Sequence, residues 1–240
     1  MKKKLLIAIS ILLALALLGG AIYYFAVVLP DQREHAARLQ AAQDYYDQKL
    51  VSYAAENTQY APHEVDVVFL GDSLTDGYDV QNWYPQYLVL NRGIGGDTTF
   101  GLEQRLQVSV YDVQPKVVVM LIGANNMETM FDNYERILQG FRDHLPNTKV
   151  VLLSLTSMGQ DWGRKNHLAA YNNVKIQLLA KKYGYIYVDL YSALLDPETD
   201  QIRPEYTTDG GHQTQAGYQV FTDTITPVLD QLLADTADAQ

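Results

Sequence analysis

The stretch Val65-Asp66-Val67-Val68-Phe69-Leu70-Gly71-Asp72-Ser73-Leu74 decides the fold. β-Branched and aromatic residues dominate its first six positions, which is typical of a strand buried on both faces of a parallel sheet. Gly71 permits a sharp turn after the strand, and ligands in open α/β sheets bind beyond the carboxyl ends of the strands. Ser73 therefore lies where a nucleophile belongs, provided that the chain also supplies a base, a group that orients the base and donors for an oxyanion.

Short apolar runs alternate with helical patterns along the rest of the chain. The predicted strands cover residues 65–70, 88–91, 117–122, 150–155 and 185–188. The predicted helices between and after them cover residues 98–108, 127–145, 165–183 and 215–233. This alternation predicts a parallel sheet with helices on both faces.

Three polar segments follow predicted strands or precede a predicted helix. They are residues 91–98 (NRGIGGDT), residues 121–126 (LIGANN) and residues 209–212 (DGGH). Together with the stretch that ends in Gly-Asp-Ser-Leu, they resemble the four blocks of the SGNH, or GDSL-type, hydrolase family of esterases and lipases. The resemblance covers roughly residues 65 to 220. It implies a flavodoxin-like three-layer α/β/α sandwich with a five-stranded parallel sheet.

Ser73, Asp209 and His212 are the candidate catalytic residues. Asp209 precedes His212 by three positions, so in a loop its carboxylate can hold the imidazole in the tautomer that accepts the serine proton. The alternative for Ser73 is a helix N-cap, and for residues 209–212 a solvated turn. Of the other four histidines, one lies in the predicted stalk (His35), and three have no chemical companions nearby (His63, His144 and His167).

The family resemblance implies an oxyanion hole with three donors: the backbone N–H groups of Ser73 and Gly96, and the side-chain amide of Asn125. An amide suits this position because it donates without acting as a base. The family often has Asp directly after this Asn, whereas this chain has Asn126. That departure concerns a supporting hydrogen bond, not the oxyanion donor itself.

Composition excludes several other classes of function. The chain has no cysteine, which excludes disulfides, thiolate catalysis and cysteine zinc sites. No acidic cluster has the character of a metal site, and the expected mechanism needs no metal or cofactor. The net charge is −10, and every acidic residue lies from Asp31 onward, so nucleic acid is not expected as a partner. A small neutral or cationic ester, or a glycan ester, suits this surface better.

The N-terminal end carries a membrane-anchor pattern. Lysines at positions 2–4 precede residues 5–29, which contain no charged residue. As a helix those residues would extend about 37 Å at about 1.5 Å per residue, enough to cross a bilayer. The positive-inside rule then places the N-terminus inside and the following domain outside. The alternative is secretion after signal cleavage at the A-x-A-like residues 14–16.

The expected organisation has four parts. Pro30 marks or breaks the end of the membrane span, and residues 31–56 show the apolar spacing of an amphipathic helix. We expect a membrane anchor over residues 1–30, a helical stalk or linker over 31–59, the hydrolase domain over 60–236 and a short tail over 237–240. The sequence leaves the oligomeric state open.

The functional hypothesis is a membrane-anchored, extracytoplasmic serine esterase that acts on a short-chain O-acyl ester, such as acetyl, of a glycan or small molecule. A lysophospholipase or thioesterase, and a non-catalytic surface glycan-binding domain on the same fold, are the alternatives. One group of aromatic residues and one group that is rich in methionine could each serve the active site or simply pack in the core. They are a sugar-stacking rim of Tyr78, Trp83 and Tyr84, and an acyl pocket of Met120, Met127, Met130 and Phe131.

Overall fold

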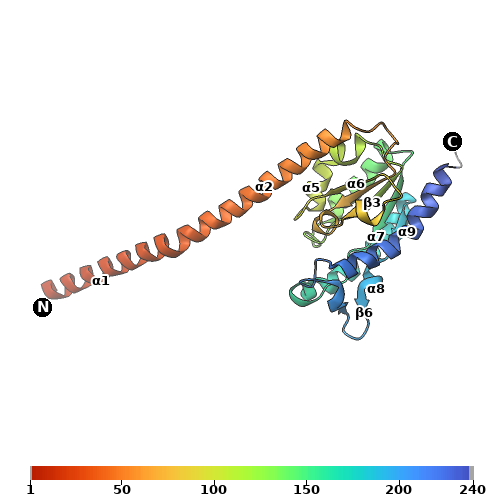
Figure 1. Cartoon of the computed structure of the whole chain (residues 1–240). Coiled ribbons are helices and arrows are strands. Elements are labelled where there is room, and N and C mark those ends of the chain that lie inside the picture. Colours follow the sequence, from red (N-terminus) through yellow and green to blue (C-terminus); the bar gives the residue numbers. More distant parts are fainter. Residues whose placement is uncertain (1, 238–240) are drawn as a thin grey trace. The chain divides into compact units, whose positions relative to one another are not determined.

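The computed structural model describes residues 2–237 of the chain, so residues 238–240 of the expected tail lie outside the described part. The chain divides into two compact units, one ending at Gln48 and the other beginning at Lys49 (Figure 1). A helical run extends from the first unit into the second. It consists of α1 (Lys2–Tyr23), the π-helical turn η1 (Tyr24–Val28) and α2 (Leu29–Asn57). In the described part of the chain, this run alone has the length and apolar composition needed to cross a membrane.

Pro30 does not break the helix, so that part of the expectation is wrong, whereas its place at the end of the membrane span stays a prediction. It lies in the first turn of α2, which begins at Leu29. The helical run continues on both sides of Pro30, so the proline removes one backbone N–H donor from it. The preceding π-helical turn, in which the Leu29 N–H bonds to the Tyr24 carbonyl, changes the backbone register just before the proline.

A five-stranded parallel sheet forms the centre of the second unit, in the order β2-β1-β3-β4-β5. The strands are β1 (Val67–Gly71), β2 (Val89–Gly93), β3 (Val117–Leu121), β4 (Lys149–Leu153) and β5 (Ile186–Val188). Each overlaps a predicted strand, and every pairing is parallel. The flavodoxin-like order that the family resemblance implies is therefore confirmed.

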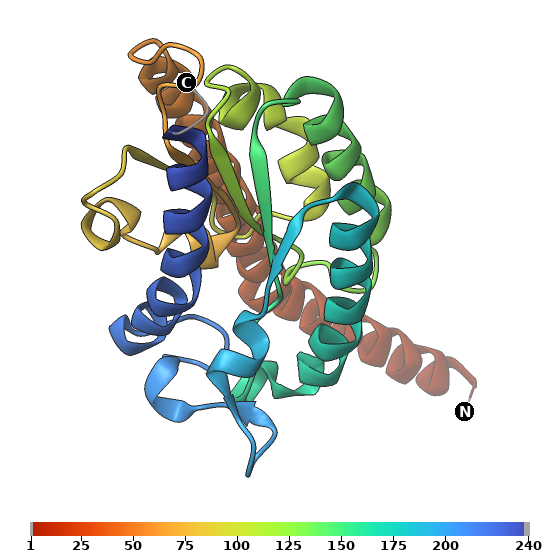
Figure 2. The same cartoon turned by 90° about the vertical axis from the view of Figure 1, so that its right-hand side faces the viewer.

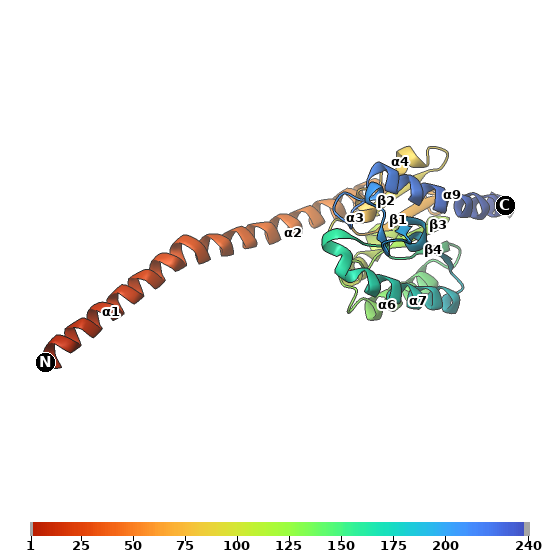
Figure 3. The ribbon, with the colours of Figure 1, turned by 90° about the horizontal axis from the view of Figure 1, so that it is seen from below.

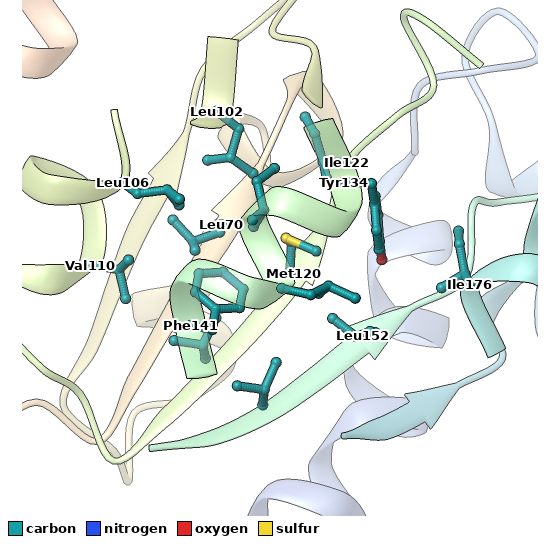
Figure 4. Close-up of a cluster of buried hydrophobic side chains, with 14 of the residues drawn as sticks. Leu70, Leu102, Leu106, Val110, Met120, Ile122, Tyr134, Phe141, Leu152 and Ile176 are labelled. Carbon is teal, nitrogen blue, oxygen red and sulfur yellow. The ribbon is translucent and has the colours of Figure 1, made fainter. Parts of the chain in front are cut away.

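Helices cover both faces of this sheet (Figures 2 and 3). One face packs against α5 (Thr99–Gln104), the π-helical turn η2 (Gln107–Tyr111), α6 (Phe131–His144) and α7 (Asn166–Tyr183). The other face packs against α3 (Ser73–Asp76), α4 (Val80–Trp83), α8 (Leu190–Leu194) and α9 (Gln215–Ala237). In Figure 4, Leu70, Met120 and Leu152 of the strands lie among Leu106, Phe141 and Ile176 of the first helical layer. The three-layer α/β/α sandwich is confirmed.

Several connections differ from the sequence prediction. The predicted helix over 98–108 is interrupted at Arg105, whose side chain turns into the core instead of continuing the helix face. The predicted helix over 127–145 begins only at Phe131, because residues 123–129 form turns. A small antiparallel pair, β6 (Leu195–Asp196) and β7 (Gln201–Ile202), and two 3-10 turns, η3 (Gln160–Lys165) and η4 (Pro204–Tyr206), were not predicted. All of these lie in connecting segments around the sheet.

Candidate active site

Only glycine fits at the last position of β1, where the chain turns toward α3. A Cβ on Gly71 would lie 2.1 Å from Thr75 Oγ1 and 2.3 Å from the Leu121 carbonyl oxygen, far inside contact distance. The chain can therefore pass close to β3 and enter α3 immediately after the strand. This places the next residues at the carboxyl edge of the sheet, where ligands bind in folds of this type.

Ser73 is the first residue of α3, and Asp72 is its N-cap. The Leu74 N–H donates to Asp72 Oδ1 at 3.1 Å. The capping role is thus filled by Asp72, which removes the alternative in which Ser73 serves as the cap. The backbone N–H of a first helical residue has no intrahelical acceptor, so the Ser73 N–H is placed to donate to a ligand at this edge.

The structure brings Ser73, His212 and Asp209 together. Ser73 Oγ lies 3.1 Å from His212 Nε2, and His212 Nδ1 lies 2.7 Å from Asp209 Oδ2. The second carboxylate oxygen of Asp209 accepts the N–H groups of His212 at 2.8 Å and Gly211 at 2.9 Å. The Asp209 carboxylate therefore stabilises the turn over residues 209–212, and the His212 imidazole still faces Ser73.

The Asp209 carboxylate is suited to remain charged at neutral pH. Partial burial by itself would raise the pKa of Asp209, but the N–H groups of His212 and Gly211 and the imidazole outweigh burial and lower that pKa to about 2. An ionised carboxylate beside Nδ1 selects the tautomer with a proton on Nδ1. Nε2 is then an acceptor facing the Ser73 hydroxyl, as a general base requires.

Asn125 and Gly96 lie on the loops after β3 and β2. Asn125 Nδ2 donates to the Asp97 carbonyl at 2.8 Å, which uses one of its two amide protons. Gly96 has φ +79°, a left-handed conformation that favours glycine. Asn125 borders the same hollow as Ser73, whereas Gly96 is outside the residues that line it. The Asn125–Asp97 bond nevertheless joins the two loops.

Asn126 supplies the supporting contact that the sequence left in question. Its Oδ1 accepts the Thr99 N–H at 3.2 Å, and its Nδ2 donates to Thr99 Oγ1 at 2.9 Å. That hydroxyl donates to the Met130 carbonyl at 3.0 Å. An aspartate at position 126 could still accept the Thr99 N–H. It could not donate to Thr99 Oγ1, because a carboxylate only accepts. Asparagine therefore fits both of its neighbours.

A small hollow opens beside Ser73. Its volume is about 20 Å³, and it is lined by Ser73, Leu74, Ala124, Asn125, Trp162, Gly211 and His212. Trp162 forms one wall and meets the His212 ring edge-on, with ring centroids 5.9 Å apart. A Cβ on Gly211 would lie 2.9 Å from the indole, so the tryptophan fills the space that a side chain there would occupy. A volume of this size holds about one water or methyl group.

Asp72 is a buried acid directly beside the nucleophile. Its side chain is fully enclosed, and Oδ2 has no hydrogen-bond partner in the described part of the chain. Burial, and secondarily the charge of Asp97, raises the pKa of Asp72 to about 7, against the opposing bond from Leu74. The structure thus places a second titratable carboxyl within the site.

Arg105 is a buried connector that sequence reasoning missed. Its guanidinium donates to Asp97 Oδ2 at 2.8 Å, to the Arg92 carbonyl at 2.8 Å and to the Gly71 carbonyl at 2.9 Å. It therefore ties the ends of β1 and β2 to the loop that carries Gly96. No local pattern marks this role, because an arginine at the end of a helix resembles a surface residue. Trp162 was missed for the same reason, since it lies in a polar 3-10 turn.

Most side chains of the two groups that the sequence left open to a functional role belong to the core, and Trp83 and Phe131 are half-buried and pack against it. Tyr78 and Tyr84 are buried, contact each other through their hydroxyls at 2.9 Å and pack on Phe69. The methionines proposed for an acyl pocket are likewise buried within the sheet–helix core: Met120, Met127 and Met130. Neither the sugar-stacking rim nor the methionine pocket is supported.

Comparison with known proteins identifies the family of the chain. The model of the GDSL-like lipase/acylhydrolase family matches residues 69–220. The human platelet-activating factor acetylhydrolase IB subunit alpha2 is 28% identical over 194 residues, covering 73% of this chain and 80% of that protein. The lipoprotein YqeF of Bacillus subtilis is 29% identical over 187 residues, covering 62% of this chain and 75% of that protein.

A solved structure gives the same result for the fold. The crystal structure of a GDSL-like lipase from Bacteroides thetaiotaomicron has a TM-score of 0.68 and 25% identity, covering 76% of this chain and 97% of that one. The family match spans more than half of the chain and includes all of the candidate catalytic residues. The chain belongs to the GDSL-like lipase/acylhydrolase family and is a carboxylic ester hydrolase.

Proposed function

We propose that the chain is a membrane-anchored serine esterase whose catalytic domain lies outside the cytoplasm and which removes a short acyl group, such as acetyl, from a glycan or small molecule. The observation that carries the catalytic part is the hydrogen-bonded series Ser73 Oγ–His212 Nε2 at 3.1 Å and His212 Nδ1–Asp209 Oδ2 at 2.7 Å. It supplies a nucleophile, a base and a group that orients the base.

In this proposal, Ser73 Oγ attacks the ester carbonyl while His212 Nε2 takes the hydroxyl proton. The negative charge that develops on the carbonyl oxygen is met by the N–H groups of Ser73 and Gly96 and by the second amide proton of Asn125. His212 then returns its proton to the leaving alcohol. Water, activated by the same imidazole, releases the acid from Ser73.

The size of the hollow supports a short acyl group. About 20 Å³ lies between Trp162 and the other walls, which is room for about one methyl group. The acetylhydrolase relative also acts, by its name, on an acetyl ester. A lysophospholipase or long-chain thioesterase would need a longer channel beside Ser73.

The N-terminal helical run supports the membrane anchor. Its apolar part begins after the lysines at positions 2–4, the arrangement in which the positive-inside rule places a following domain outside. A relative named as a lipoprotein fits an envelope location. Protease added to intact cells should digest the domain, and complete protection would contradict the outward orientation. If a chain that lacks residues 1–16 were released into the medium, signal cleavage would be favoured instead.

A panel of aryl esters from acetate to octanoate tests the reaction and the acyl preference together. The wild-type chain should hydrolyse acetate best, and Ser73→Ala should abolish turnover while the protein stays folded. Preference for octanoate would favour the lysophospholipase or thioesterase alternative. Glycan binding without hydrolysis of any ester would favour the non-catalytic alternative.

A further inference from the structure

The last turns of α2 contact the loop that carries Gly96. Tyr53, which is buried, donates from its hydroxyl to the Gly93 carbonyl at 2.6 Å. Lys49 Nζ lies 2.7 Å from Asp76 Oδ1, and the other oxygen of that carboxylate accepts the Gly95 N–H at 2.8 Å. Tyr53 therefore contacts the start of the segment before Gly96 directly, and Lys49 reaches the Gly95 N–H through the Asp76 carboxylate.

Asp76 links this segment to the nucleophile helix. It is the last residue of α3, the four-residue helix that begins with Ser73. A Cβ on Gly93 would lie 2.2 Å from the Asp76 backbone nitrogen, so strand end and helix end are in direct contact. The Asp76 carboxylate thus fixes the Gly95 N–H relative to Ser73, and Lys49 fixes the carboxylate.

The same contacts set which N–H of the loop is available to a ligand. The Gly95 N–H is taken by Asp76, whereas the Gly96 N–H has no hydrogen-bond partner among the described residues. Gly96 holds a left-handed conformation at φ +79°. If the turn before it shifted, the direction of the Gly96 N–H would shift too.

A second anchor comes from Arg92 at the end of β2. This side chain is fully buried, lies 4.5 Å from the centre of the Tyr53 ring, and donates to Asn57 Oδ1 at 2.9 Å. It also forms an ion pair with Glu56. The end of α2 is therefore packed against β2 both by ring contact and by charge.

We propose that Lys49 and Tyr53 are positioning residues that hold the Gly93–Gly96 turn in the geometry needed to bind the oxyanion, so that turnover depends on the end of α2. The inference rests on the proposed function, in which the Gly96 N–H is an oxyanion donor. Misplacing catalytic groups by about 1 Å can cost about 10²-fold in rate. Loss of one of these two anchors should cost about tenfold in kcat, less than removal of a donor outright.

The full-length protein in detergent micelles tests this with Tyr53→Phe and Lys49→Met, assayed on an aryl acetate. Tyr53→Phe keeps the ring under Arg92 and removes only the hydroxyl. Matched controls lie away from the site. Tyr185→Phe removes a hydroxyl that also donates to a backbone carbonyl, of Leu138 at 3.1 Å. Lys116→Met removes the partner of Asp66, 2.8 Å away with a similar degree of exposure.

Each site variant should lose about tenfold in kcat with KM changed less than about twofold, because an oxyanion donor acts mainly in the transition state. Each control should show a comparable shift in Tm with wild-type kcat. Lys49→Arg, which keeps the cation, should restore most of the kcat lost in Lys49→Met. Site variants whose kcat equals that of their controls would overturn the inference.

Failure of the proposed function gives a different result. If Ser73→Ala retained hydrolysis, the mechanism itself would be wrong. If Ser73→Ala is inactive while Tyr53→Phe and Lys49→Met turn over like wild type, only the positioning role is refuted. Should Tyr53→Phe fail to fold, the comparison of Lys49→Met with Lys49→Arg still decides the question.

Discussion

Asp72 should make the stability of the enzyme fall as pH rises from acid to neutral. The pKa of Asp72 is raised by burial from its ordinary value of 3.8 to about 7. Between those values the unfolded chain has lost the proton that the folded protein keeps, so the free energy of unfolding decreases with pH at about 1.4 kcal/mol per pH unit. Over the whole window this amounts to about 4 kcal/mol.

The Asp72→Asn variant removes this titration and keeps the cap, because an amide oxygen can still accept the Leu74 N–H. Above pH 7 the variant should be more stable than wild type by up to about 4 kcal/mol, whereas near pH 4 the two should be alike. Urea unfolding of the full-length protein in detergent at pH 4.5, 6 and 8 measures the difference.

Asp189→Asn is the control for this experiment. Asp189 caps α8 by accepting the Ser192 N–H at 3.0 Å, but it is exposed to solvent. The reasoning is refuted if wild type and Asp72→Asn have parallel stability profiles between pH 4.5 and 8. Parallel profiles would mean that Asp72 is ionised in the folded protein despite its burial and its unpartnered oxygen.

Three further substitutions test the site. Asp209→Asn should lower kcat by about 10⁴, because an amide can orient His212 in the wrong tautomer; a loss below tenfold in steady-state kinetics would show that another group orients the ring. Asn125→Ala should lower kcat by about 10²–10³ with little change in KM, and wild-type kcat in the folded variant would remove Asn125 from the oxyanion site. Trp162→Ala should raise kcat/KM for butyrate relative to acetate by about tenfold or more, since one methylene in an apolar pocket is worth about 1–3 kcal/mol; an unchanged ratio would show that the indole does not limit acyl length.

Much of this fold could be predicted because its signals are local. Each buried strand appears as a short run of apolar residues, and Gly71 and the segment around Gly96 mark the turns at the carboxyl edge. The pairing of Asp209 with His212 is also local. The two residues are three positions apart, so the Asp209 carboxylate can accept the backbone N–H of His212 and also contact its imidazole. These features need no knowledge of distant parts of the chain.

The parts that could not be predicted depend on long-range contacts. Arg105 and Trp162 acquire their roles only when β1, β2 and the loop before His212 come together. Tyr78 follows the nucleophile in sequence, yet it turns into the core, where its ring stacks on Tyr218 and its hydroxyl lies 2.6 Å from Thr222 Oγ1 of α9. The contact of Tyr53 with Gly93 joins residues forty positions apart, which no periodic pattern encodes.

The Ser73–His212 pair carries the central claim, and covalent labelling tests it most directly. Wild-type protein should react stoichiometrically with an alkyl fluorophosphonate, and peptide mass mapping should place the adduct on Ser73. His212→Ala should react at least about 10²-fold more slowly, because an unassisted serine hydroxyl is a poor nucleophile. An adduct on another residue, or labelling of His212→Ala at the wild-type rate, would contradict the assignment of Ser73 as nucleophile and His212 as its base.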